Sequence, residues 1–170
     1  MEISIRTATE ADAPALRRYA ERLFGERPPG IYRRDTPSVA EEVDFIRSRL
    51  TPANSTTLVA EDGTAIIGLL DFAGGSLEEE RHTGSFGISV DRDYRAAGIG
   101  SALIERLLAW APTAGITRVE VRAWSNNPRA LALYRRLGFR EEGCLKAAIT
   151  SDGQPVDVIV LARLLGEEQF

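Results

Sequence analysis

A glycine-containing loop that runs directly into an apolar helix is the feature that most constrains this chain. The loop reads Arg-Ala-Ala-Gly-Ile-Gly at residues 95–100, and residues 101–110 have the apolar spacing of a helix. Glycine lets a loop turn tightly and lets another molecule approach the backbone closely. The first turn of a helix has N–H groups without intrahelical partners and the positive end of the helix dipole. Because Arg95 adds a positive charge, the segment predicts a binding site for a phosphate or pyrophosphate.

The glycine pair has two other interpretations. One is a plain strand-to-helix turn, and the other is the start of a dinucleotide-binding turn of the pattern G-x-G-x-x-G. That pattern requires a third glycine where this chain has Leu103, and it begins at a strand end, whereas residues 91–97 separate Gly98 from the strand ending at Val90. Glu120 does stand where a dinucleotide-binding fold has its ribose-binding acid. The downstream sequence decides between these interpretations.

A second helix-forming motif follows a strand-like run farther along the chain. Asn127 is a good N-cap, Pro128 suits the first helical position, and Gly138 suits the position just after a helix. The pattern predicts a helix over about residues 128–137, with Tyr134 near its C-terminal end.

The two motifs together resemble those of the GNAT superfamily of N-acetyltransferases. The first is R-x-x-G-x-G at residues 95–100, and the second is N-P-x-A-x-x-L-Y-x-x-L-G-F at residues 127–139, with one helix and one strand between them. The resemblance extends from about Ile5 to Leu164. Residues 82–164 further resemble a bacterial subgroup that acetylates small molecules such as amino acids, on an H-x-x-x-F-G-I-x-V pattern at the start and a D-G-x-x-V-D pattern near the end.

The length and composition indicate one ordinary globular domain over residues 1–170. The chain has 170 residues, of which 44% are hydrophobic and 27% charged, and a net charge of −4. This charge argues against a nucleic-acid partner. The single cysteine, Cys144, excludes an internal disulfide. Because no apolar run approaches the ~20 residues of a membrane span and the N-terminus lacks a signal-peptide core, we expect a cytoplasmic protein without a membrane partner.

Hydrophobic periodicity and turn residues predict the element order β-α-α-β-β-β-α-β-α-β-β. Strands are predicted at 3–7, 56–61, 64–72, 86–90, 118–124, 140–149 and 156–164, and helices at 10–24, 39–50, 99–110 and 128–137. Residues 25–37 contain Pro-Pro-Gly and are expected to form a loop. The helix that follows Ser38 is expected to bury Val43, Ile46 and Leu50.

This element order is that of the superfamily, and the resemblance therefore implies an α/β fold. It implies one domain with a mixed, mostly antiparallel sheet and helices on both faces. In this fold the strand before the phosphate loop splays from the next strand, and acetyl-CoA lies in the resulting central cleft. We expect acetyl-CoA as the cosubstrate and no metal.

The resemblance also implies a reaction, the direct transfer of an acetyl group from acetyl-CoA to a primary amine. Tyr134 occupies the position of the general acid that protonates the departing thiolate, and its alternative role is core packing. Asn127 matches an asparagine that contacts the pantetheine arm, and it can also cap its helix. The predicted cofactor-binding residues are Ile88, Ser89, Val90, Arg95, Ala96, Ala97, Gly98, Ile99, Gly100, Ser101, Asn127 and Tyr134.

Backbone groups of the strand before the loop complete the expected site. Ile88 and Val90 are expected to pair with the pantetheine arm. The developing oxyanion needs a hydrogen-bond donor. The resemblance implies a backbone N–H near Ser89 or Val90, at a bulge in the strand.

The resemblance leaves the general base open. Some members of the superfamily use a glutamate on the central strand, but residues 82–86 contain no acid. His82, the only histidine, has a reference pKa near ~6.5 that suits a base, although a histidine at a strand start can serve only to bind backbone or solvent. Glu120 on the adjacent strand is the second candidate, and a cross-strand charge is its alternative role. Asp157 is a third candidate. The remaining alternative is that no single side chain acts as the base and water carries the proton.

One position of the loop departs from the superfamily pattern, because many relatives have glycine where this chain has Ala96. If this position requires a positive φ, alanine strains the loop. Asp91 and Asp93 also place negative charge near the expected pyrophosphate. Because Arg95 and both loop glycines are present, we expect these departures to weaken the affinity at most.

The subgroup resemblance implies a small-molecule partner, the α-amine of an amino acid or a related amine. We expect the acceptor pocket to form from the 25–37 loop, the 72–80 turn and the last hairpin. Arg33, Arg34 and Arg81 are candidates to hold a carboxylate, and a solvated surface position is the alternative for each.

Two other functions remain open. One is a protein acetyltransferase that acts on N-termini or lysines, for which a wide, open cleft is typical. The other is a non-catalytic acyl-CoA-binding regulatory module, against which Tyr134 and the phosphate loop argue. Dimerisation through a sheet edge is common in such domains, and a homodimer is compatible with the sequence.

Overall fold

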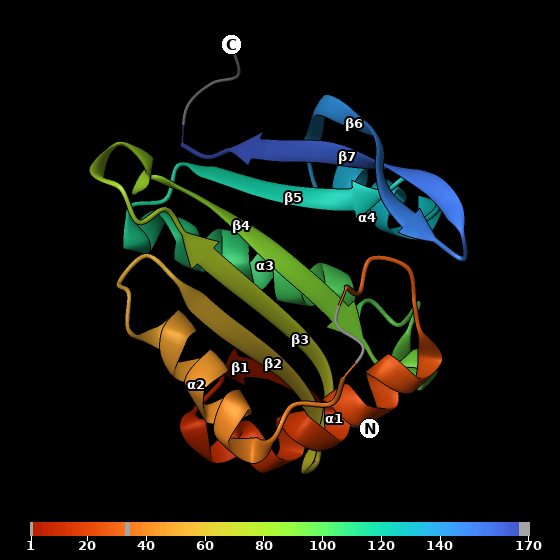
Figure 1. Ribbon diagram of the computed structural model, residues 1–170. Coiled ribbons are helices and arrows are strands. Elements are labelled where there is room, and N and C mark those ends of the chain that lie inside the picture. The colour runs from red at the N-terminus through yellow and green to blue at the C-terminus, as the bar shows by residue number, and fades with distance from the viewer. Residues whose placement is uncertain (1, 33–34, 167–170) are drawn as a thin grey trace.

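The computed structural model describes residues 2–32 and 35–166 (Figure 1). Its strands are β1 (Ile3–Thr7), β2 (Thr56–Asp62), β3 (Ala65–Gly74), β4 (Thr83–Val90), β5 (Arg118–Trp124), β6 (Arg140–Ser151) and β7 (Gln154–Leu164). Its helices are α1 (Ala13–Glu26), α2 (Val39–Leu50), α3 (Ile99–Trp110) and α4 (Pro128–Arg136). These elements confirm the predicted order. None of these helices is long and apolar enough to cross a membrane.

One seven-stranded sheet in the order β1-β2-β3-β4-β5-β7-β6 forms the centre of the molecule. Every pair of neighbours is antiparallel except β4 and β5, which run parallel. Helices α1 and α2 cover one face of the sheet, and α3 and α4 cover the other (Figure 1). The predicted mixed sheet with helices on both faces is therefore confirmed.

Each face of the sheet has its own apolar core. On one face, Leu16 of α1 and Ile46 of α2 pack with Val59 of β2, and all three are almost fully buried. On the other face, α3 buries Leu103 and Leu107, which lie one turn apart on the same side of the helix. This packing fixes the axis of α3 and therefore the place where its N-terminus meets the sheet.

The sheet splits between β4 and β5. These two strands pair only over residues 83–86 of β4 and 118–121 of β5. Beyond that point β4 stays paired with β3 as far as Val90, and β5 stays paired with β7 as far as Trp124. The splay predicted from the resemblance is therefore present, and within the described part of the chain no strand pairs with either β4 or β5 across the gap.

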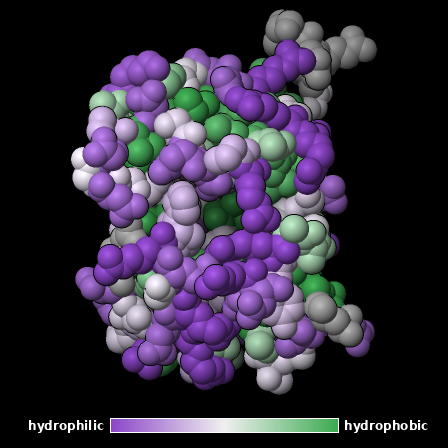
Figure 2. All heavy atoms as spheres, turned by 90° about the vertical axis from the view of Figure 1, so that its right-hand side faces the viewer, coloured by the Kyte–Doolittle hydropathy of each residue, from purple (hydrophilic) through white to green (hydrophobic). Residues whose placement is uncertain are grey.

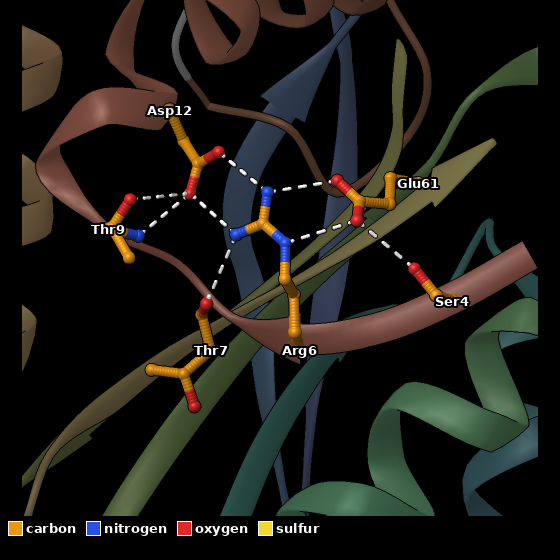
Figure 3. A network of polar contacts seen from close by, with 6 residues as sticks. All are labelled: Ser4, Arg6, Thr7, Thr9, Asp12 and Glu61. Carbon is orange, nitrogen blue, oxygen red and sulfur yellow. Dashed lines mark hydrogen bonds and ion pairs between the residues drawn. The ribbon is translucent and has the colours of Figure 1, made fainter. Parts of the chain in front are cut away.

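A network of ion pairs fixes the N-terminal edge of the sheet (Figure 3). Arg6 of β1 donates to both oxygens of Asp12 at 2.7 and 2.8 Å and to both oxygens of Glu61 at 2.9 and 3.1 Å. Asp12 also accepts from the backbone N–H of Thr9 at 2.7 Å, as in a capping box. Because the Arg6 guanidinium binds both carboxylates, it holds the pKa of Asp12 and of Glu61 below the usual range. The network ties β1 to β2 and to the start of α1.

Three local predictions were wrong. Helix α1 continues through Gly25 to Glu26, so the loop begins later than predicted. Leu50 is 39% exposed because it ends α2 beyond the edge of the core, and Glu42 is buried on that helix instead. Strand β4 begins at Thr83, because its first residues have pairing partners on both sides.

Candidate active site

A cleft of about 900 Å³ occupies the gap between β4 and β5. Its walls are the ends of both strands, the loop leading into α3, one side of α4, and residues 28–31 between α1 and α2. Figure 2 shows the face of the molecule onto which the gap opens, with an apolar hollow near its centre. Ile88 and Ser89 both line the cleft although successive side chains of a strand point to opposite faces. The cleft therefore passes through the sheet.

The N-terminus of α3 forms one mouth of the cleft. Gly98 is the N-cap, with a φ of +83°, and it has no side chain to occupy the free N–H groups of the first turn. A Cβ at Gly100 would lie 3.3 Å from Leu133 Cδ2, so the glycine leaves this part of the cleft open. Every predicted cofactor-binding residue except Ala97 lines the cleft. The mouth has the backbone geometry that a pyrophosphate requires.

Ala96 has the strained backbone that the sequence analysis anticipated. Its φ is +62°, in the left-handed region. A residue with a Cβ loses roughly 1–2 kcal/mol there. The loop therefore keeps a turn suited to glycine while carrying an alanine.

Two arginines meet this mouth in different ways. Arg95 lies 2.8 Å from Glu26 and donates through Nε to the carbonyl of Val90 at 3.0 Å, so its charge is shared with a carboxylate. Arg136, which the sequence analysis did not single out, donates to Ser101 Oγ at 2.9 Å and lines the cleft. A sequence separation of 35 residues hides this contact between the end of α4 and the start of α3.

The last residues of β4 present backbone groups to the gap. Successive residues of an antiparallel strand direct their N–H and C=O groups alternately to the two sides. Asp91 donates to the carbonyl of Ile67 at 2.7 Å, so the odd-numbered residues bond to β3. Ile88 and Val90 therefore direct their N–H groups into the gap that β5 has left.

The bulge predicted near Ser89 or Val90 is wrong. Strands β3 and β4 keep an unbroken register over residues 84–90. The Tyr19 hydroxyl lies 2.8 Å from Ser89 Oγ and supports this register from the α1 side. The N–H groups of Ile88 and Val90 have no strand partner among the described residues because β5 turns away, which requires no extra residue in β4.

Tyr134 lies where the gap begins. Its ring packs edge-on against Phe86, the last β4 residue paired with β5, with the ring centroids 5.8 Å apart. The residue is 5% exposed, and burial raises the pKa of its hydroxyl to about 12. Among the described residues, none forms a hydrogen bond with this hydroxyl. The phenol is therefore protonated at neutral pH and free to donate into the cleft.

Asn127 caps α4 and also lines the cleft. Its Oδ1 accepts from the backbone N–H of Ala130 at 3.3 Å, which confirms the predicted N-cap. Its Nδ2 lies near the loop between α1 and α2: a Cβ added at Gly30 would be 3.9 Å from this nitrogen. The two ends of one amide can therefore serve the helix and the cleft.

The comparisons with known proteins agree with this geometry. A family model described as the acetyltransferase (GNAT) family matches residues 8–139. The chain belongs to this family. The N-alpha-acetyltransferase RimI of Mycobacterium tuberculosis is 33% identical over 144 residues, which cover 83% of this chain and 80% of that protein.

Two further GNAT proteins are similar to this chain, one in sequence and one in structure. The L-amino acid N-acetyltransferase AaaT of Escherichia coli is 30% identical over 84 residues, 49% of this chain, and the match spans only about half, 52%, of that relative's length. The crystal structure of a GNAT superfamily phosphinothricin acetyltransferase from Sinorhizobium meliloti, in complex with AcCoA, has a TM-score of 0.86 and 26% identity. That superposition covers 98% of this chain and 90% of the other.

The GNAT cleft does not include the predicted bases. His82 is exposed just before β4, about four residues and roughly 13 Å along the strand from Phe86, the first β4 residue that lines the cleft. Glu120 has Arg118 at 3.4 Å from one oxygen and Arg122 at 3.4 Å from the other. Neither His82 nor Glu120 lines the cleft.

Asp157 is also poorly placed for a base. Its carboxylate accepts from the backbone N–H of Ala147 at 2.8 Å and from Lys146 at 3.1 Å. These bonds hold its pKa below the usual range, so it binds a proton weakly.

The second mouth of the GNAT cleft was only partly predicted. Residues 28–31 line it, but the 72–80 turn and the last hairpin do not. Arg81 is exposed and lies outside the cleft, while Arg33 and Arg34 fall outside the described residues. Within residues 2–32 and 35–166, no group of three or more His, Cys, Asp or Glu side chains could hold a metal ion.

Trp124 is the residue that the sequence analysis missed at this mouth. It is 5% exposed, it lines the cleft at the end of β5, and the Tyr32 ring packs edge-on against it with centroids 5.2 Å apart. Its buried indole N–H has no hydrogen-bond partner among the described residues. A buried donor without an acceptor is uncommon in folded proteins, so this group is suited to an oxygen of a bound molecule.

Proposed function

We propose that the protein transfers the acetyl group of acetyl-CoA to the primary amine of a small molecule, an amino acid or a related amine. The observation that most supports this is a cleft that runs through the sheet, with a helix N-terminus at one mouth and an apolar, aromatic wall at the other. The helix N-terminus suits the phosphates of CoA. The N–H groups of Ile88 and Val90 suit the amides of the pantetheine arm and the oxyanion that develops during transfer.

In this proposal Tyr134 donates a hydrogen bond to the departing sulfur. A thiol has a reference pKa near ~8.5, below the value of about 12 to which burial raises Tyr134. Complete proton transfer from the phenol to a thiolate is therefore uphill, and stabilisation by the hydrogen bond is the larger contribution. The protons balance because the amine releases one as the C–N bond forms and the sulfur takes one up after the C–S bond breaks.

The second mouth supports a small acceptor. Pro28 and Pro29 restrict the backbone of its rim, and Ile31 and Trp124 make its wall apolar. Tyr32 covers the Trp124 ring from outside. A wall of this kind suits a compact side chain beside the amine.

A protein N-terminus is the second candidate acceptor. The similarity to an N-alpha-acetyltransferase over 80% of that relative's length favours it. An N-terminal residue and a free amino acid both present an amine on the Cα atom, next to a carbonyl or carboxylate carbon, so one recognition site serves either. The two acceptors differ because the polypeptide that follows a protein N-terminus must leave through the second mouth of the cleft, whereas a free amino acid has no such chain.

The test is release of CoA from acetyl-CoA, measured with a thiol reagent across amino acids, polyamines, aminoglycosides and short peptides. The exposed thiol of Cys144 would also react with the reagent, so the Cys144→Ser variant is measured alongside to show how much of the signal comes from this thiol. In Tyr134→Phe we expect kcat to fall about 10–100-fold, while the affinity for acetyl-CoA changes less than about twofold. Turnover of peptides alone would favour the protein acceptor. Tight acetyl-CoA binding without CoA release on any amine would favour a non-catalytic acyl-CoA-binding module.

A further inference from the structure

We infer that Asp71, on β3, binds the ammonium group of the acceptor beside Gly87 and takes a proton from it. This inference rests on the proposed function, and it supplies the base that none of the residues selected from the sequence provides. It follows from the register of β3 and β4, the missing side chain at Gly87, and the route of the cleft through the sheet.

Asp71 and Gly87 are direct partners in the antiparallel pair of β3 and β4. Their side-chain positions therefore lie on the same face of the sheet. A Cβ at Gly87 would lie 3.1 Å from Asp71 Oδ1. Asp71 itself does not line the cleft, but its carboxylate oxygen lies next to the bare backbone of Gly87, which does.

The face that carries Asp71 is the acceptor's face. Ser89 points to the same side as Gly87, and it meets Tyr19 of α1. The phosphate mouth is formed by α3, which covers the opposite face. Because CoA enters from the α3 side, the amine must approach from the α1–α2 side, where Asp71 lies.

Among the residues that the structure describes, Arg49 is the one side chain that donates a hydrogen bond to Asp71. Arg49 of α2 donates through Nε to Asp71 Oδ2 at 3.2 Å, and both side chains are 28% exposed. No other residue that the structure describes donates to Oδ1 from its side chain. The facing residues on the adjacent strands, Thr57 of β2 and Gly87 of β4, carry no charge.

The electrostatics agree with a proton acceptor. Burial raises the pKa of the Asp71 carboxyl, and the positive charge of Arg49 acts in the opposite direction. A raised pKa brings the carboxylate closer to the pH at which a base works well. Asp157, by contrast, has its pKa held low by its donors.

The proposed step balances simply. An N–H bond of the ammonium breaks, its electron pair stays on nitrogen, and an O–H bond forms at Asp71 Oδ1. The neutral amine then forms the C–N bond with the acetyl carbon as the C–S bond breaks. Asp71 returns its proton to solvent through the acceptor mouth, and the sulfur ends as a thiol.

The experiment is the pH profile of kcat/KM for Asp71→Asn, with the amine that gives the fastest CoA release in the wild type. We expect kcat/KM to fall about 100-fold at neutral pH. We also expect the acid limb that Asp71 causes to disappear. The affinity for acetyl-CoA, measured by calorimetry, is expected to stay within about twofold. Asp44→Asn, which removes a surface carboxylate of the Arg47 pair on α2, is the matched control and should leave the profile unchanged.

Arg49→Gln gives a signed second test. Removing the positive charge disfavours the carboxylate, so the pKa of Asp71 rises and the acid limb moves to higher pH by about one unit. A purely structural pair would instead lower the stability of both variants and leave the limb in place. Gly87→Ala inserts a methyl group between Asp71 and the cleft and should lower kcat/KM about tenfold or more, without loss of acetyl-CoA affinity.

The outcomes separate the two proposals. A wild type that turns over an amine, with an acid limb unchanged in both Asp71→Asn and Arg49→Gln, would overturn the role of Asp71 alone. A wild type that is silent on every amine would overturn the proposed function and this inference with it. Loss of the limb in Asp71→Asn, together with its upward shift in Arg49→Gln, would support both.

Discussion

The two mouths of the cleft are built in different ways. The phosphate mouth consists mainly of consecutive residues, 95–101, whose backbone supplies the binding groups. The acceptor mouth brings together residues 28–31, Gly87 and Trp124, which come from three separate parts of the chain, and there the side chains differ from point to point. A backbone site places requirements on its own segment, whereas a side-chain site depends on how distant segments meet.

The sharpest test of this comparison is a charge at the phosphate mouth. In Gly100→Glu a carboxylate enters the first turn of α3, where it should repel the phosphates of acetyl-CoA. At a few Å separation, two charges near a protein surface interact by about 4 kcal/mol, so we expect the acetyl-CoA affinity to fall at least about 100-fold. A calorimetric titration with acetyl-CoA measures this.

The same substitution should leave the fold intact. An acidic residue near a helix N-terminus is ordinarily favourable, and the nearest obstacle to a side chain at Gly100 is the flexible end of Leu133, 3.3 Å away. Ala102→Glu is the control, because Ala102 lies in the same helix but does not line the cleft. Equal losses of affinity in both variants would mean that α3 does not form the phosphate mouth.

The same contrast explains what could be predicted from the sequence. The periodicity of the strands and helices, the cap at Asn127 and the turn at Gly98 are local requirements, and they predict the order of the elements and the start of α4 correctly, although not every element boundary. The family resemblance also indicated Ala96 as a position where alanine is strained if φ is positive, and its φ is +62°.

The rest depends on register and packing. Asp71 lies beside Gly87 only because β3 and β4 pair in one particular register, and Arg136 reaches Ser101 only because α4 packs beside α3. His82 was selected for its chemistry, and its place at the far end of β4 could not be judged without the cleft. Residue type indicates which chemistry is available, and tertiary contacts decide which of those groups meet.

A smaller effect is expected from Trp124→Phe at the acceptor mouth. The variant keeps an aromatic ring against Tyr32 and removes only the indole N–H and part of the ring. If that N–H meets an oxygen of the acceptor, the KM for the acceptor should rise about threefold to tenfold, which is the usual contribution of one hydrogen bond. Initial rates at saturating acetyl-CoA measure it.

The stability of Trp124→Phe provides the control for that prediction. Removing an unpaired buried N–H is favourable, and the lost ring volume is unfavourable. We expect the two to offset, so that the melting temperature changes by less than about 3 °C. A raised KM for both acetyl-CoA and the acceptor would show that the variant disturbs the whole cleft and not only the acceptor mouth.

The smallest effect is expected from Ala96→Gly at the phosphate mouth. Glycine relieves the cost of the left-handed conformation, roughly 1–2 kcal/mol, but it also gains roughly 0.5–1 kcal/mol of freedom in the unfolded chain. The net gain of about 0.5–1 kcal/mol should raise the melting temperature by about 1–4 °C.

Ala147→Gly is a matched control, since Ala147 also has a positive φ, of +49°, and lies on exposed β6 outside the cleft. If the strain at Ala96 is the same in the free and bound states, both variants gain stability and neither changes the affinity for acetyl-CoA by more than about twofold. If acetyl-CoA binding relieves that strain, Ala96→Gly alone will bind acetyl-CoA more weakly, because the free protein has then lost a cost that binding would have removed. That outcome would mean that the backbone mouth is specified by stored strain as well as by its sequence.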